Sequence, residues 1–380
     1  MTERPKVSII GTRGYPSYYG GFETAVRKLA PFLADQGWDV TVYGRPGATK
    51  NDDPTRDSRI NTKVTAGLET KSFSTLSYGL TAVVDALWTK PDVALVMNVA
   101  NGFWLPLLKL RGIRTVVNVD GIEWEREKWG KAAKTVFKLS ARFTAAFGTT
   151  LVSDALEIQR RWKQEFRRES VFIPYGGDVP GELKVEENQI SRGYILVVAR
   201  FVPENTMPAF FEAVEALGSK YPVIIVGSSG YGGALDQRAQ QLADSFDNIT
   251  WLGHVSDDRR LLALWQHAGA YFHGHSVGGT NPALVQAMAC GAPIVARDTV
   301  YNREVLGSTA VFVDPSPDAI AEALLQTMEK SLANDFDPSP VRERAVEHYS
   351  WVDVCRRYEK TLKSESRHKA HSNTNQSAMA

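Results

Sequence analysis

The stretch that decides the fold reads AYFHGHSVGGTNPALVQAMACGAPIVA, from Ala270 to Ala296. A short apolar run, the predicted strand Ala270–His273, opens it; a glycine-rich turn follows, and an apolar helical segment then begins with Pro282 in its first turn. A second apolar run, Pro293–Ala296, comes directly after that segment. Two short buried strands joined by one helix are typical of a βαβ unit, so the stretch predicts a parallel sheet covered by helices.

The same alternation of apolar runs and helical segments extends outward in both directions. In the first half of the chain it predicts strands at Val7–Ile10, Asp39–Tyr43, Asp92–Val96, Arg114–Val119 and Thr149–Val152. In the second half it predicts further strands at Tyr194–Val198, Val223–Val226, Ile249–Leu252 and Ala310–Val313. Helices are predicted at Phe22–Gln36, Pro208–Leu217, Asp257–His267 and Pro282–Cys290. The fold class is therefore α/β, with two Rossmann-like domains built on parallel sheets.

The length of the chain agrees with two domains, because 380 residues at about 150 per domain gives between two and three. The polar segment Gly176–Arg192 contains glycine and proline and is the predicted join. We expect a first domain at 1–180 and a second at 181–345. The last segment, 363–380, has almost no large apolar residues, and we expect it to be disordered.

Charge and cysteine content exclude several classes of function. The 44 lysines and arginines nearly balance the 43 aspartates and glutamates, so no overall charge would attract nucleic acid. Cys290 and Cys355 are too few for a disulfide scaffold or a structural zinc site, and Cys290 is expected to pack in the core. The segment Met1–Lys6 is too polar for a secretory signal, and no apolar run reaches the roughly 18 residues of a membrane span. We expect a cytoplasmic protein that could be peripheral on the inner face of the cell membrane.

Ligands of doubly wound sheets collect where strands end, and the first such end is the loop 11–23. This loop lacks the G-x-G-x-x-G pattern, which argues against a dinucleotide cofactor. Gly20 and Gly21 stand at the start of a helix, where backbone N–H groups can approach an anion or a sugar closely. The same two glycines could equally form a plain tight turn.

A second strand end precedes Pro282. The glycine-rich turn Gly278–Asn281 would direct free N–H groups and the positive end of the helix dipole at a diphosphate. Gln286 lies about one helical turn further on, so its amide could reach a nucleoside hydroxyl.

Five segments, in order along the chain, carry a resemblance to a known family: GTRGYPSYYGGFET (11–24), DGIEWEREKW (120–129), ARFVPEN (199–205), HGHSVGGTNP (273–282) and NREV (302–305). They resemble nucleotide-sugar-dependent glycosyltransferases of the GT-B fold, in the large retaining group often called family four. Within that group they are similar to the bacterial rhamnosyltransferase branch that builds cell-surface polysaccharides. The resemblance implies two Rossmann-like domains facing across a cleft, with a C-terminal helix at 346–362 that crosses back to the first domain.

The resemblance also implies roles for individual residues. Asp120 matches a position beside the transferred sugar, and Arg200 matches the basic residue that neutralises the donor diphosphate, so these two are the implied catalytic residues. The residues assigned to donor binding are Gly20, Gly21, Asn205, His275, Gly278, Gly279, Thr280, Asn281, Gln286 and Glu304. Asp120 could instead cap a following helix, since aspartate is a good N-cap residue.

Three positions depart from the pattern of the broad group. Two glutamates eight positions apart are replaced here by Gly278 and Gln286, and Asn205 stands where many relatives have lysine. Glutamine can still hold a ribose hydroxyl, although a neutral acceptor forms a weaker bond than a carboxylate. We therefore expect Gln286→Glu to keep or improve donor affinity.

No metal ion or cofactor is expected, and the nucleotide sugar is a substrate. His273 and His275 are two positions apart, but no third ligand is near them in sequence, and no D-x-D motif stands at a strand end. Arg200 and a helix N-terminus can stabilise a leaving diphosphate without metal.

A basic stripe, formed by Lys131, Lys134, Lys138 and Arg142, lies on one face of a predicted helix. Trp124, Trp129, Phe137 and Phe143 lie around it. The stripe is either a solvated face over an ordinary core or a docking site for anionic lipid that carries the acceptor.

The sequence thus predicts a retaining, metal-independent glycosyltransferase of the hexosyltransferase type. The expected donor is dTDP-rhamnose, and the expected acceptor is a saccharide on a polyprenyl-diphosphate lipid. One alternative is the same enzyme class with UDP-glucose, UDP-N-acetylglucosamine or GDP-mannose as donor. Another is a non-catalytic sugar-nucleotide or glycan-binding protein, in which Gln286 marks lost activity.

Overall fold

The chain forms two compact units in the computed structural model, which describes residues 4–18, 20–50, 52–68, 74–127, 129–217, 220–230 and 232–377. The first unit comprises 1–125, 129–174 and the segment from Trp351 onward, and the second comprises 126–128 and 175–350. The chain therefore enters the second unit at Tyr175, earlier than the expected join at 180/181. The reason is that the backbone N–H of Gly177 donates to the carbonyl of Tyr349 at 2.8 Å, which ties this segment to the second unit.

The described part of the first unit contains a seven-stranded parallel sheet in the order β3-β2-β1-β4-β5-β6-β7. Its strands are β1 (Lys6–Ile10), β2 (Asp39–Gly44), β3 (Asn61–Val64), β4 (Val93–Met97), β5 (Arg114–Asn118), β6 (Thr150–Ser153) and β7 (Val171–Phe172). The connecting helices are α1 (Gly21–Asp35), α2 (Ser74–Thr89), η1 (Val99–Trp104), α3 (Leu105–Leu110), η2 (Glu123–Glu125), α4 (Lys131–Phe147), α5 (Leu156–Phe166) and α13 (Trp351–Ser377).

The second unit contains, in its described residues, a six-stranded parallel sheet in the order β10-β9-β8-β11-β12-β13. Its strands are β8 (Ile195–Val198), β9 (Val223–Val226), β10 (Ile249–Gly253), β11 (Ala270–His273), β12 (Ile294–Arg297) and β13 (Val311–Val313). Its helices are η3 (Pro203–Asn205), α6 (Met207–Leu217), α7 (Ala234–Ser245), α8 (Asp258–His267), α9 (Pro282–Cys290), α10 (Val300–Leu306), α11 (Pro317–Leu332) and α12 (Ser339–Tyr349).

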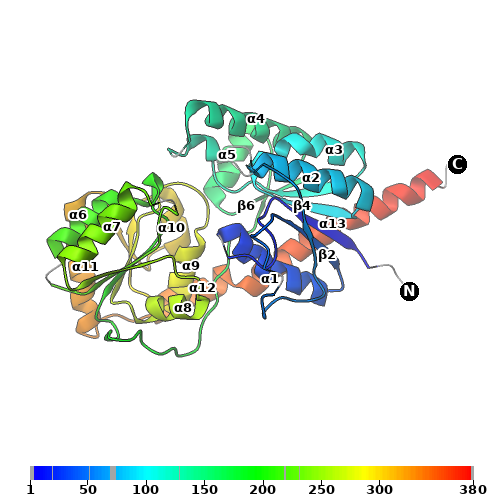
Figure 1. Cartoon of the computed structure of the whole chain (residues 1–380). Helices are drawn as coiled ribbons and strands as arrows, with labels where there is room; N and C mark the ends of the chain where they lie inside the picture. The colour runs from blue at the N-terminus through cyan, green and yellow to red at the C-terminus, as the bar shows by residue number, and fades with distance from the viewer. Residues whose placement is uncertain are drawn as a thin grey trace. The chain divides into compact units, whose positions relative to one another are not determined.

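Both sheets are doubly wound, with helices on each face (Figure 1). In the second unit, alternate side chains of β8 enter different cores: Leu196 packs with α8, α9 and α12, whereas Ile195 and Val197 pack with α6 and α11. This alternation follows from the two-residue repeat of a strand. In the first unit, α2, α3 and α4 cover one face, and α1 and α13 pack together on the β4–β5 side of the other. The predicted fold class, two parallel-sheet Rossmann-like domains, is confirmed.

The two edge strands β3 and β7 were not predicted. The sequence of β3, NTKV, is polar and exposed, and β7 has only two residues. An edge strand needs no continuous apolar run, because one side of it is open to solvent.

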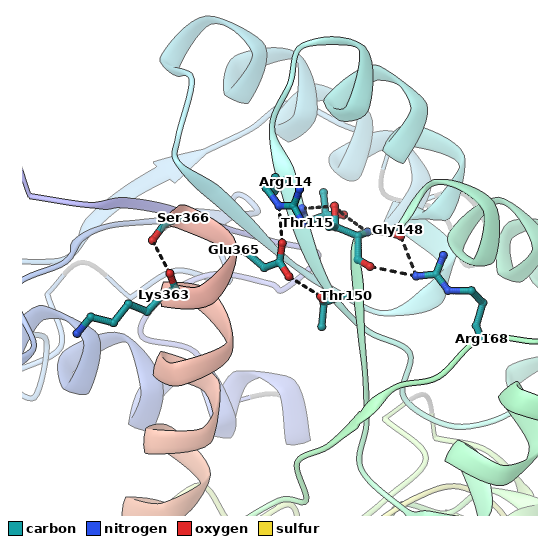
Figure 2. A network of polar contacts seen from close by, with 9 residues as sticks. Arg114, Thr115, Gly148, Thr150, Arg168, Lys363, Glu365 and Ser366 are labelled. Atoms are coloured by element: carbon teal, nitrogen blue, oxygen red, sulfur yellow. Dashed lines mark hydrogen bonds and ion pairs between the residues drawn. The ribbon is translucent and has the colours of Figure 1, made fainter. Parts of the chain in front are cut away.

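The C-terminal helix extends past its expected end at 362 into the segment that was expected to be disordered. Helix α13 begins at Trp351, continues through Ser377 and belongs to the first unit, while residues 378–380 lie outside the described part. Figure 2 shows the buried carboxylate of Glu365 between Arg114 on β5 and Thr150 on β6, whose hydroxyl donates to it at 2.6 Å. The polar composition was misleading because this end of the helix is anchored by an ion pair and a hydrogen bond rather than by apolar burial.

Candidate active site

Each sheet has one topological switch point, where ligands of such folds bind at the carboxyl ends of the strands. In the first unit it lies between β1 and β4, and in the second between β8 and β11. The loop 199–205 leaves β8 and the turn 274–281 leaves β11, so these two segments meet at one edge of the second sheet. Seven of the twelve predicted site residues lie in these two segments, whereas Gln286 and Glu304 lie further along the second unit, in α9 and α10.

The N-terminus of α9 has the construction of an anion site. Asn281 is the N-cap residue, and its side chain accepts a hydrogen bond from the N–H of Ala283 at 3.0 Å, with Pro282 in the first turn. Gly278 has φ +111°, a conformation that side-chain-bearing residues rarely adopt, which explains why glycine stands there. Thr280 is buried and Gly279 is half-buried in the turn. The predicted turn Gly278–Asn281 is therefore a shaped loop leading into a helix N-terminus.

Asn205 connects the two loops of the second unit. Its Nδ2 donates to the carbonyl of Arg200 at 2.7 Å, and its Oδ1 accepts from Nδ1 of His275 at 2.6 Å. The N–H of Ser276 also donates to the carbonyl of Glu204 at 2.8 Å. Because both ends of the Asn205 amide are engaged, this residue positions Arg200 and His275 in addition to any contact with a donor.

Two arginines lie around the same turn. A Cβ on Gly278 would come within 3.3 Å of both Nη2 of Arg126 and Nε2 of His275. The buried site and the charges of Arg126, His273 and Arg200 hold the pKa of His275 well below its usual range, with burial the largest cause. His275 is therefore neutral at physiological pH, and positive potential converges on the α9 N-terminus. Arg126 was quoted within the 120–129 segment but was not predicted as a site residue.

His273 plays a different part from His275. It is buried, its Nδ1 is 3.1 Å from the hydroxyl of Tyr271, and burial lowers its pKa to about 3. Among the described residues, no cluster of three or more His, Cys, Asp and Glu side chains is arranged to hold a metal ion. Cys290 is buried as expected, and burial raises the pKa of its thiol to about 12.

Gln286 differs most from its predicted role. Its Oε1 accepts from the N–H of Asp178 at 3.0 Å, and its Nε2 donates to the carbonyl of Asp178 at 2.6 Å. The side-chain amide thus forms a two-bond pair with one peptide unit and is committed to holding the segment after Tyr175 against α9. A glutamate at this position would lose one of these bonds, because a carboxylate cannot donate to a carbonyl.

Glu304 lies on α10, and its backbone carbonyl accepts from Nη2 of Arg344 at 2.8 Å. The α10 residue that reaches the turn is Asn302, whose Nδ2 donates to the carbonyls of His275 at 2.9 Å and Arg297 at 2.8 Å. Asn302 was not predicted to be a site residue, although it begins the NREV segment. A buried amide between two carbonyls fixes the loops after β11 and β12 to each other.

In the first unit, Gly20 and Gly21 start α1 as predicted. Gly20 is the N-cap residue without a side-chain cap, and Glu23 in the first turn is buried and accepts from the N–H of Arg13 at 3.0 Å. A carboxylate at this end of a helix is stabilised by the helix dipole. Glu23 was missed from the sequence, although its position right after a glycine pair was a usable signal.

Asp120 follows β5 in a strained backbone conformation, with φ +51°. Its N–H donates to Oδ1 of Asn118 at 2.8 Å, and Nδ2 of Asn118 donates to the hydroxyl of Tyr358 on α13 at 2.7 Å. The nearest helix, η2, begins three positions later at Glu123, so Asp120 does not occupy an N-cap position. The hydrogen bonds through Asn118 thus fix the backbone of Asp120, whose half-buried side chain stands just after β5, and its catalytic role stays a prediction.

The basic stripe lies on α4 as predicted. Lys131, Lys138 and Arg142 are exposed and Lys134 is half-buried. Lys138 forms an ion pair with Glu165 at 2.9 Å. No helix in the described ranges is both long and apolar enough to cross a bilayer.

Two families match parts of the chain. Residues 182–343 match the family described as "Glycosyl transferases group 1", and residues 73–178 match a domain of unknown function, DUF1972. The first match contains the entire β8–α10 region and therefore all the site residues predicted in the second unit. The second unit is thus similar to group 1 glycosyl transferases over most of its length.

Relatives with a described activity include several mannosyltransferases and a phosphatidylinositol N-acetylglucosaminyltransferase subunit of Schizosaccharomyces pombe. The O-antigen chain mannosyltransferase B of Escherichia coli is 28% identical over 36% of this chain and 37% of its own length. The phosphatidyl-myo-inositol mannosyltransferase of Mycolicibacterium smegmatis is 30% identical over 54% of each chain. The chain thus spans about half, or less, of the length of these curated relatives.

Solved structures extend the likeness to nearly the whole chain. Sucrose-phosphate synthase from Thermosynechococcus elongatus has a TM-score of 0.77 and 17% identity, over 95% of this chain and 99% of that one. HepE from Anabaena, in complex with UDP and glucose, has a TM-score of 0.74 and 15% identity, over 95% and 100%. The fold is GT-B.

The GT-B assignment agrees with the resemblance found in the sequence for both sheets. The strand ends of the second unit carry Arg200, and those of the first unit are followed by the carboxylates Glu23 and Asp120. Tyr358 could not have been found from local patterns, because it is 240 residues from its partner Asn118.

Proposed function

We propose that this protein is a metal-independent glycosyltransferase that moves a sugar from a nucleoside-diphosphate donor to a saccharide acceptor. The observation that carries the proposal is the α9 N-terminus, where the shaped turn Gly278–Asn281 meets positive charge from Arg200 and Arg126. Backbone N–H groups of the turn, a helix dipole and guanidinium groups together provide what a diphosphate leaving group requires.

The chemistry follows from that placement. The bond between the sugar anomeric carbon and the diphosphate oxygen breaks, its electron pair stays on the diphosphate, and the acceptor hydroxyl forms the new bond to the same carbon. The growing negative charge is stabilised by Arg200 and the amides of the turn, which need no reorganisation during the reaction. The carboxylate of Asp120 stabilises the positive charge on the oxocarbenium-like sugar. The hydroxyl proton leaves with the diphosphate, as retention of configuration implies.

For the donor we propose dTDP-rhamnose. The support is the similarity of the 11–24, 120–129 and 273–282 segments to the rhamnosyltransferase branch. Mannosyltransferase relatives and the UDP and glucose complex of HepE make GDP-mannose and UDP-glucose the alternatives. Neutral His275 and the compact turn at Gly278 would lie against the diphosphate with any of these donors.

For the acceptor we propose a saccharide carried on a polyprenyl-diphosphate lipid at the inner face of the membrane. The support is the basic stripe on α4, together with relatives named for O-antigen chain and phosphatidyl-myo-inositol mannosylation. Retention of configuration is proposed from the family resemblance.

A donor panel tests the proposal. The protein is incubated with dTDP-rhamnose, UDP-glucose, UDP-N-acetylglucosamine or GDP-mannose and a lipid-linked saccharide acceptor, with and without a metal chelator. We expect one donor to give product at a rate that the chelator does not change. Saturable nucleotide binding without product from any donor would favour the non-catalytic sugar-nucleotide-binding alternative. Absence of binding to every nucleotide would contradict the diphosphate site itself.

A further inference from the structure

The outer surface of the α2–α3–α4 layer exposes large apolar side chains. Trp88 is 81% exposed at the end of α2, and Leu110 is 87% exposed at the end of α3. Val84 lies one turn before Trp88 on the same helix face, and Val136 and Leu139 are exposed on α4. Soluble surfaces expose single apolar residues commonly, but a tryptophan and a leucine with most of their surface in water need a reason.

Printed contacts show that these residues are neighbours. Nε of Arg111 donates to the carbonyl of Leu87 at 3.2 Å, which brings the end of α3 beside the end of α2. Nζ of Lys109 lies 5.6 Å from the ring centre of Phe147 at the end of α4. The helices α2, α3 and α4 run side by side on one face of the first sheet (Figure 1). The ends of α2, α3 and α4 therefore lie together, and the exposed apolar side chains of these three helices are here named the α2–α4 face.

Most charges on this face are positive, although Lys138 is paired with Glu165 of α5 at 2.9 Å. Its exposed cations are Lys90, Lys109, Arg111, Lys131, Lys138 and Arg142. Helices α3 and α4 contain no acidic residue. Asp85 on α2 is bonded to Lys63 and Tyr43, and Asp92 accepts from the N–H of Lys6, so both are occupied away from the face.

We infer that the α2–α4 face binds an anionic lipid bilayer, with Trp88 and Leu110 entering the headgroup region. Apolar side chains ringed by lysine and arginine, in a chain without a spanning helix among its described residues, fit an interfacial mode of binding. Anionic lipid complements the cations, which a second copy of the same positive face would repel. The functional role of this docking rests on the proposed function, in which the acceptor is lipid-linked. The binding to vesicles can be measured without donor or turnover.

The first experiment measures binding of the full chain to vesicles by sedimentation. Vesicles of phosphatidylcholine alone are compared with vesicles containing about one third phosphatidylglycerol. We expect wild-type binding to the anionic vesicles only, and a loss of roughly tenfold or more in the double variant Trp88→Ser/Leu110→Ser. Ile190→Ser is the matched control, because Ile190 is 77% exposed in the second unit and outside the face. Lys90→Gln/Lys109→Gln should reduce binding and weaken its dependence on salt.

The outcomes separate clearly. Equal vesicle binding by wild type and Trp88→Ser/Leu110→Ser, or no binding by the wild type, overturns the inference. A wild type that is a dimer in solution and a variant that is a monomer also overturns it, because the face would then bind a second copy. Both substitutions are on the surface, so unchanged melting is expected and checks that the fold is intact. If the face only docks to lipid, the Trp88→Ser/Leu110→Ser variant keeps wild-type activity on a soluble acceptor. If the proposed transferase function is wrong, neither protein shows activity, and the vesicle-binding result still tests the docking.

Discussion

The two sheets of this protein have the same winding but opposite chemistry at their strand ends. In the first unit, the ends of β1 and β5 lead to the carboxylates Glu23 and Asp120. In the second, the ends of β8 and β11 lead to Arg200, the turn Gly278–Asn281 and the N-terminus of α9. The same topology thus prepares one edge for positive charge and the other for negative charge. This difference supports the second unit as the proposed site of the diphosphate.

The second-unit turn and Asp120 of the first unit also differ in the hydrogen bonds that hold them. The second-unit turn is fixed by amides, Asn205 and Asn302, that bond to neighbouring loops of the same sheet. Asp120 is fixed through Asn118 by Tyr358, which comes from the last helix of the chain. The first arrangement is local to one sheet, whereas the second depends on α13 being in place.

Asp120→Asn should have the largest effect. Asparagine also tolerates positive φ, so the backbone at φ +51° is kept while the negative charge is removed. We expect the rate of transfer to fall by roughly 10²–10⁴-fold, the range for loss of an acid–base or charged group at a reacting centre. Donor affinity by calorimetry and the melting temperature should match the wild type. Early melting with normal specific activity would make Asp120 a structural residue.

Arg200→Ala should come next. Removing a cation beside the leaving diphosphate costs about 2–4 kcal/mol of transition-state stabilisation, and donor binding weakens as well. The comparison variant is Arg259→Ala, since Arg259 is exposed in the first turn of α8 and is outside the loops 199–205 and 274–281. Steady-state kinetics of both variants decides the matter: equal rates in Arg200→Ala and wild type would remove Arg200 from the site.

Tyr358→Phe should have a smaller effect that tests the chain from α13 to Asp120. Without the hydroxyl, Nδ2 of buried Asn118 has lost its acceptor, and Asn118 no longer holds Asp120 as firmly. We expect kcat to fall about tenfold while KM for the donor is unchanged. Thr150→Val is the control, because it removes the bond from Thr150 to Glu365 on the same helix and should lower stability without lowering kcat. Equal activity losses in the two variants would mean that α13 acts on stability alone.

The Gln286 substitutions should have the smallest effect on catalysis. Gln286→Ala loses both bonds to the Asp178 peptide, and Gln286→Glu loses the one that the side chain donates. Each should lower the free energy of unfolding by about 1–2 kcal/mol, with donor affinity little changed. Calorimetry and thermal melting on both variants distinguish this structural role of Gln286 from the ribose-binding role expected from the sequence. A clear loss of donor affinity with unchanged melting would restore the ribose role.

The sequence predicted what depends on local pattern. Buried strands such as Val223–Val226 and Ala270–His273 are continuous apolar runs, so they were predicted with their observed bounds. The turn before Pro282 was recognisable because glycine, asparagine and proline have definite positions around a helix N-terminus. The edge strand β3 was missed because its residues are polar on both faces.

What was missed depends on contacts between distant parts of the chain. The partner of Gln286 is the peptide at Asp178, 108 residues away, so a motif at one end could not reveal it. The order of the C-terminal segment depends on the bond from Glu365 to Thr150, 215 residues away, which its polar composition concealed. Glu23 and Arg126 were within quoted motifs, but only the structure shows that they are buried beside the glycine turns.

The central claim is that the donor diphosphate binds at the strand ends of the second unit. A crystal structure of the full chain with dTDP, or with whichever nucleotide binds best, tests it most directly. We expect the diphosphate oxygens within hydrogen-bond distance of the backbone N–H groups of Gly279, Thr280 or Asn281 and of the Arg200 guanidinium. A diphosphate bound instead at the loop 11–23 of the first unit, with the α9 N-terminus empty, would contradict the account.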